Sequence, residues 1–248
     1  MILLVRAGSH VPDQILDYLQ IEFKGISTIL YTLLAARMPT TPILGASALE
    51  NAVEDENLSL CSLLLDHKAP LNYHGRSGMT CLQRAAREND LLLTRFLFEH
   101  GADVNFAAHE DGGRTALQSA VEYNATPVVE FLLSVGADIR AAPAKRNGVT
   151  VLEALAKSYT SILNFCEVRL DAPRYVNMED ILSKLGRFRN WVAKGAPINR
   201  PNGEDGKLLH YFVLNFNHAC LEEALVLGAK TDARCHEGQD EEDCEGWN

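Results

Sequence analysis

The chain repeats itself with a fixed step of 35 residues, and this period limits the possible fold more than any other feature. Thr80 and Thr115 each open a run of the form T-x-L-Q-x-A, and Thr150 lies one further step along the chain. The first two runs lead into apolar stretches that end at Gly101 and Gly136. A period of this length is typical of stacked helix pairs, in which each unit buries its apolar face only against its neighbours. The sequence therefore predicts an all-α solenoid.

The residues that recur at this step have local physical roles. The hydroxyl of Thr80 can cap the first turn of a short helix. Ala85 and Ala120 are small, so they allow two helices to approach closely. Gly101 and Gly136 follow the second helix of each unit, where a left-handed residue ends a helix at little cost.

The runs resemble the ankyrin repeat. The family pattern T-P-L-H-x-A is present with its Pro and His replaced, by Cys81 and Gln83 in one unit and by Ala116 and Gln118 in the next. The resemblance implies a solenoid of helix pairs with projecting β-hairpin-like fingers. It also implies that a partner protein docks on the concave side, which finger tips and the first helix of each pair build together.

We divide the chain into three segments. We expect a partial repeat plus an atypical helical pair over residues 1–44, five ankyrin-like repeats over 45–234, and an acidic disordered tail over 235–248. Met1 is either the natural start or the point at which a longer repeat array has been cut.

The fourth repeat is interrupted. Its glycine, Gly195, lies 59 residues beyond Gly136, so we expect a helical insert at about residues 157–179. The stretches 161–168 and 180–194 could each supply its second helix, and we favour the latter because it runs directly into G-A-P-I-N.

Charge and composition exclude several classes of function. The net charge is −10, and the last 14 residues supply six acids and no base, so the rest of the chain still carries −4. A nucleic-acid-binding protein needs an excess of basic residues, which this chain lacks, so we expect no direct nucleic-acid binding. No apolar run is long enough for a membrane span. The six scattered cysteines indicate reduced thiols, so we expect the protein in the cytoplasm or nucleus.

We expect no catalytic residues, no cofactor and no metal. Cys81 lies at a helix start, where the pKa of a thiol is generally lowered. We favour the simpler explanation that it is a small residue filling the proline position of the repeat. Cys235, His236 and Cys244 match no compact zinc spacing. The insert offers Cys166 without a histidine, so an enzyme site there is the weakest of our alternatives.

The remaining candidate is a binding surface. Mapped onto this chain, the finger tips and the inner ends of the first helices carry basic residues with two apolar anchors, which would suit another protein with an acidic segment. The chain's own tail is a second candidate occupant. The partner-binding residues we predict are Arg76, Met79, Arg84, Arg87, Arg114, Tyr123, Lys145, Arg146 and Lys157.

Two functions follow from the resemblance. Small free-standing ankyrin proteins often regulate transcription factors, so a transcription co-regulator is our first expectation. The second is an adaptor that presents a bound target to a ubiquitin ligase through the N-terminal helices, residues 11–38. The oligomeric state stays open.

Overall fold

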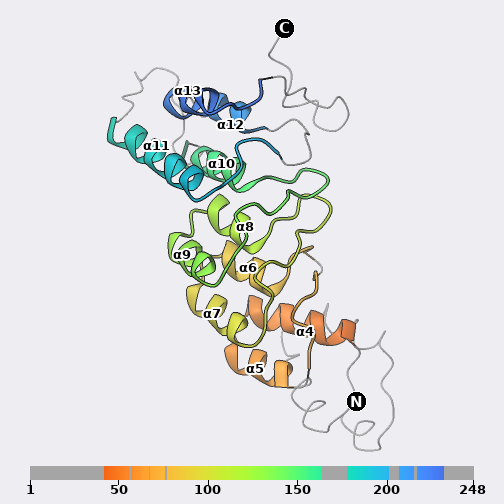
Figure 1. Ribbon diagram of the computed structural model, residues 1–248. Coiled ribbons are helices and arrows are strands. Elements are labelled where there is room, and N and C mark those ends of the chain that lie inside the picture. Colours follow the sequence, from red (N-terminus) through yellow and green to blue (C-terminus); the bar gives the residue numbers. More distant parts are fainter. Residues whose placement is uncertain are drawn as a thin grey trace, which may run out of the picture.

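The protein is a stack of helix pairs (Figure 1). The computed structural model describes residues 42–55, 57–66, 68–75, 77–163, 178–200, 207–214 and 217–231. In these residues ten helices follow one another, and the all-α solenoid that the period predicts is confirmed. They are α4 (Pro42–Glu54), α5 (Leu58–Asp66), α6 (Cys81–Arg87), α7 (Leu91–Glu99), α8 (Ala116–Glu122), α9 (Thr126–Ser134), α10 (Val151–Leu163), α11 (Met178–Ala193), α12 (Leu208–Leu214) and α13 (His218–Val226).

The helices form two layers. The first helices of the pairs, α4, α6, α8, α10 and α12, contact one another in sequence order, and each also contacts the helix that follows it. Among the second helices, α7 contacts α9 and α11 contacts α13. The connecting loops reach out on one side of the stack (Figure 1). Each pair is therefore covered by its neighbours along the chain.

Threonine caps start the first helices α6 and α8. The Thr80 hydroxyl accepts a hydrogen bond from the Gln83 backbone N–H at 3.2 Å, while the Gln83 side chain accepts one from the Thr80 N–H at 2.9 Å. Thr115 and Gln118 repeat this arrangement with the same distances. Two of the four free N–H groups at each helix start are thus satisfied locally.

The second helices end at left-handed residues. The φ angles of Gly101 and Gly136 are +98° and +91°, a region that a side chain makes unfavourable. Lys68 holds the equivalent place in the first pair with φ +65°, at a cost of about 1 kcal/mol.

The core runs through the stack without a break. Ala85 and Ala120 are buried where consecutive first helices pack together, as the repeat pattern predicts. Leu82 and Leu117 are buried beside them. Small and large side chains alternate at these contacts, so neighbouring pairs pack closely.

The fingers are the loops that join each helix pair to the next, and the one between α7 and α8 is hydrogen-bonded through its backbone to the one between α9 and α10. The Gly112 N–H donates to the Arg146 carbonyl at 2.8 Å, and the Arg146 N–H donates to the Glu110 carbonyl at 3.0 Å. These bonds form one isolated bridge between Asp111 and Arg146, and the described residues contain no longer strand ladder. The β-hairpin-like part of the finger is therefore minimal.

Helix boundaries depart from the sequence-based division in two places. α4 begins at Pro42, within the segment assigned to the N-terminal pair, and proline is accepted there because it lies in the first helical turn. α10 continues to Leu163, into the expected insert, and α11 contacts both α10 and α13. The N-terminal pair and the acidic tail lie outside the described residues, so the three-segment division stays a prediction.

Candidate functional site

One row of side chains runs along the first helices on the side of the fingers. Each member lies four, seven or eight residues after the residue that precedes its helix, which is Thr80, Thr115, Thr150 or Lys207. We call this row the inner strip; it consists of Arg84, Arg87, Glu122, Tyr123, Lys157, Tyr211 and Leu214.

Contacts between consecutive pairs show that these residues share one side. The Arg84 guanidinium lies 2.8 Å from the Glu54 carboxylate of α4. The Lys157 ammonium of α10 lies 3.0 Å from the Glu122 carboxylate of α8. Together with the Arg87–Tyr123 contact between the second and third pairs, these contacts make the inner strip continuous from the second pair to the fourth.

The most exposed aromatic residue of the inner strip is Tyr123, at the end of α8. Half of its surface is accessible, and the Arg87 guanidinium lies over its ring, 4.9 Å from the ring centre. Among the residues that the structure describes, Arg87 pairs with no carboxylate. Stacking on the ring holds the guanidinium while its N–H groups stay available.

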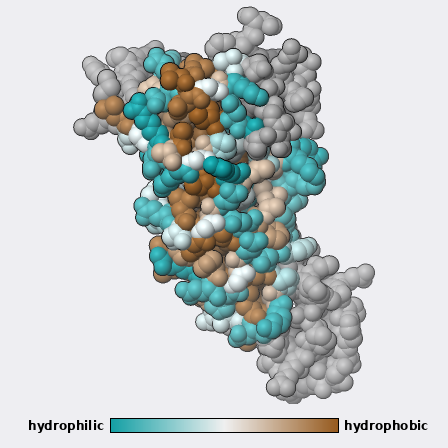
Figure 2. All heavy atoms as spheres, in the orientation of Figure 1, coloured by the Kyte–Doolittle hydropathy of each residue, from teal (hydrophilic) through white to brown (hydrophobic). Residues whose placement is uncertain are grey.

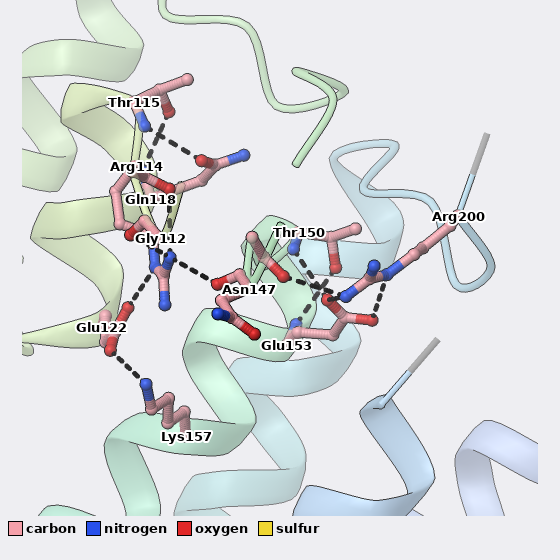
Figure 3. Close-up of polar contacts among 12 residues, drawn as sticks. Gly112, Arg114, Thr115, Gln118, Glu122, Asn147, Thr150, Glu153, Lys157 and Arg200 are labelled. Atoms are coloured by element: carbon pink, nitrogen blue, oxygen red, sulfur yellow. Dashed lines mark hydrogen bonds and ion pairs between the residues drawn. The ribbon is translucent and has the colours of Figure 1, made fainter. Parts of the chain in front are cut away.

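Arg114 lies under the strip and belongs to the fold. Its Nε lies 2.6 Å from the Glu122 carboxylate, and its Nη1 donates to the Gly112, Gly113 and Asn147 carbonyls (Figure 3). Its side chain is 13% exposed. Arg114 thus ties two fingers to α8, and we move it from the predicted partner-binding set to the residues that hold the fingers.

Glu122 is held between two cations. Burial favours the neutral acid, but the charges and hydrogen bonds of Arg114 and Lys157 outweigh it, so the pKa of Glu122 lies below its ordinary value. The carboxylate stays ionised at neutral pH, and its charge compensates the two cations that contact it.

The finger tips carry two exposed ion pairs. Lys145 lies 2.6 Å from Glu110, and Arg146 lies 3.3 Å from Asp111. All four side chains are at least half exposed, so each pair contributes little stability. Lys145 and Arg146 are predicted site residues, and the structure pairs each of them with an acid of the preceding finger.

The basic residues of the predicted partner-binding set do not form a patch of unpaired positive charge. Of its described members, all except Arg87 pair with a carboxylate of this chain. Arg76 lies outside the described residues, and Met79 is partly buried next to the Thr80 cap. The cation that stays available for a partner is Arg87.

A buried ion pair that the sequence did not reveal joins Glu153 to Arg200. The guanidinium lies 3.0 Å from the carboxylate, whose side chain is only 2% exposed (Figure 3). Arg200 also donates to the Gly148 carbonyl, and the Lys207 N–H donates to Glu153. The available signal was an acid at the position that Gln118 holds one repeat earlier.

The fifth pair adds two residues that sequence reasoning missed. Counting four and seven residues from Lys207, as from Thr80, gives Tyr211 and Leu214. Tyr211 is partly buried, and burial together with the Glu153 charge raises its pKa. Leu214 is 47% exposed. The inner strip thus becomes apolar at this end.

The described residues offer little for catalysis. Burial raises the pKa of the Cys81 thiol to about 12 and that of Cys61 to about 11, so neither is a thiolate at neutral pH. They contain no cluster of three or more residues that could bind a metal ion. No described helix is long and apolar enough to span a membrane.

Comparison with known proteins identifies the repeats. The family model for ankyrin repeats, which holds three copies, matches residues 21–108 and again residues 49–143. No curated protein matches the chain. The two overlapping matches cover the pairs that carry the threonine caps and helix-ending glycines described above. The chain belongs to the ankyrin-repeat family, whose repeats form modules for protein–protein interaction.

Proposed function

We propose that this protein is a non-enzymatic regulator, such as a transcription co-regulator, that binds another protein along the inner strip. The observation that carries the proposal is the exposed Tyr123 ring with the Arg87 guanidinium stacked on it. Tyrosine and arginine are the residues that most often dominate binding energy at protein interfaces.

The surroundings of this pair favour binding. Tyr123 and Arg87 come from neighbouring helix pairs, so a partner that contacts both spans a rigid junction of the stack. The adjacent carboxylate of Glu122 is already engaged by Arg114 and Lys157 and does not compete for Arg87. Little conformational entropy is lost when a partner docks on a preorganised surface.

The kind of module supports the proposed regulatory role. Ankyrin repeats bind proteins, and the described residues contain no group of three or more side chains that could hold a metal ion. We expect the protein to act in the cytoplasm or nucleus. The adaptor alternative depends on residues 11–38, which lie outside the described residues.

A pull-down from cell extract tests the proposal. The purified chain is compared with Tyr123→Ala and Arg87→Ala, and captured proteins are identified by mass spectrometry. We expect each variant to lose at least about tenfold of a specific partner, because Tyr and Arg are the residue types that dominate binding energy at interfaces. Circular dichroism checks that every variant is folded.

The chain supplies a matched control. The Arg95 guanidinium lies over the Phe131 ring at 4.8 Å, in the layer of second helices α7 and α9. Arg95→Ala removes the same kind of contact away from the inner strip, and we expect it to capture the partner normally. Equal loss in all three variants, or in none, contradicts the proposed site.

A further inference from the structure

The two ends of the inner strip differ in chemistry. At α6 the strip offers the Arg87 guanidinium, and at α12 it offers the apolar side chain of Leu214. The cations nearest to Arg87, Arg84 and Lys157, are paired with Glu54 and Glu122. One end can therefore receive a negative charge, and the other can receive an apolar group.

The charged end is suited to a carboxylate. The Arg87 guanidinium over the Tyr123 ring is partly exposed, and a carboxylate can accept two parallel hydrogen bonds from a guanidinium. Tyr123 also restricts the arginine rotamers, so little further ordering is needed. No carboxylate in the described part of the chain occupies this place.

At the apolar end, a position that is buried in the preceding pairs is exposed. Val213 is 37% exposed, whereas its equivalents Val121 and Ala156 are buried against the following pair. Leu214 follows directly and is 47% exposed. Figure 2 shows apolar side chains gathered over α13 at this end of the stack. Covering these groups with an apolar side chain removes them from water, which favours binding.

We infer that the partner presents an extended segment with a carboxylate side chain at one end, over Arg87, and an apolar side chain at the other, over Leu214. The inference rests on the proposed function and names the chemistry of the partner. It follows from the one unpaired cation of the described strip and the apolar character of its far end.

The spacing of the two groups follows from helix packing. The first helices contact in the order α6, α8, α10, α12, which makes three steps. At 8–10 Å between packed helices, the ends lie about 24–30 Å apart. An extended chain rises about 3.3 Å per residue, so the acid and the apolar residue are about seven to nine positions apart.

Peptide selection tests this inference. A random library of twelve-residue peptides on phage is selected against the whole chain and against Arg87→Ala, Leu214→Ser and the control Arg95→Ala. We expect the parent and control to enrich an acid and an apolar residue about seven to nine positions apart. Arg87→Ala should lose the preference for the acid alone, and Leu214→Ser that for the apolar residue alone.

A synthetic peptide from the parent pool gives the magnitude. We expect binding about tenfold weaker to Arg87→Ala, and a similar loss when the acid is moved four positions closer to the apolar residue. Pools without this pairing, or pools unchanged by both variants, overturn the inference. If Tyr123 still controls capture from extract, the proposed function stands and only the partner chemistry is wrong.

Discussion

The central and flanking helix pairs differ at the third residue after the cap. In the central pairs this residue is a glutamine, Gln83 or Gln118, and in the flanking pairs it is a glutamate, Glu50 or Glu153. All four side chains are buried. The same position therefore holds a neutral amide in the middle of the stack and a carboxylate on either side.

The central amides are satisfied by backbone alone. The Gln118 oxygen accepts from the Thr115 N–H at 2.9 Å, and its nitrogen donates to the Ala141 carbonyl of the following finger at 3.2 Å. Gln83 bonds the following finger in the same way. Because an amide both donates and accepts, it joins helix and finger without any particular side chain.

The flanking carboxylates depend on specific partners. A carboxylate only accepts, so it needs donors from the following finger. Glu50 accepts from the Ser77 hydroxyl at 2.9 Å, and Glu153 accepts from the Arg200 guanidinium. The flanking junctions are therefore more sensitive to single substitutions than the central ones.

Loss of Arg200 should have the largest effect. Arg200→Ala leaves the Glu153 carboxylate buried without its cation, and we expect a loss of about 3 kcal/mol in the free energy of unfolding. Urea denaturation followed by circular dichroism measures it at pH 7. In a Glu153→Gln background the same substitution should cost clearly less, because the residue left behind is then neutral. Equal costs in both backgrounds would show that the charge is not what matters.

A central amide should matter less than the charged pair. Gln118→Ala removes the bonds to the Thr115 N–H and the Ala141 carbonyl, and we expect it to cost about 2 kcal/mol. The same denaturation experiment checks it, with Gln83→Ala as the equivalent change one repeat earlier. A cost above that of Arg200→Ala would reverse the comparison between central and flanking pairs.

Acid should weaken the junction at Glu122. A carboxyl whose pKa is lower in the folded chain than in the unfolded chain adds stability above its unfolded value of about 4.3, and loses this contribution as the pH falls through its folded value. The pKa of Glu122 is lowered in this way. We expect Glu122→Gln to cost about 1–2 kcal/mol at pH 7 and progressively less below about pH 4.

Unfolding of the parent and Glu122→Gln at pH 7, 5, 4 and 3 measures this difference. If the gap between the two proteins stays constant across the series, the ionised Glu122 does not contribute through Arg114 and Lys157.

The sequence predicted what the period repeats and missed what it does not. Thr80, Ala85 and Gly101 recur at a fixed step, so their roles as cap, close contact and helix end could be derived. The Arg200–Glu153 pair could not, because the interrupted fourth repeat hides which finger residue faces Glu153. The burial of the Arg114 side chain could not be derived from the pattern of residue types either.

Charge pairing shows the same limit. A count of bases predicted a basic groove, but it cannot show that a finger folds back to place Arg114 against Glu122, eight residues later. Exposed Tyr123 was identified from its position alone, and the cation stacked on it required the relative placement of two helix pairs.

Removal of the exposed ion pairs at the finger tips should change the stability least. Lys145→Ala and Arg146→Ala each remove an ion pair whose members are both at least half exposed, and water and salt screen such pairs strongly. The backbone bonds between the fingers do not involve these side chains, so they should persist. We expect no measurable change in the urea midpoint at 0.15 M salt, because exposed ion pairs contribute about 0–1 kcal/mol. A clear loss of stability would mean that the tips, and not only Arg114 beneath them, hold the two fingers together.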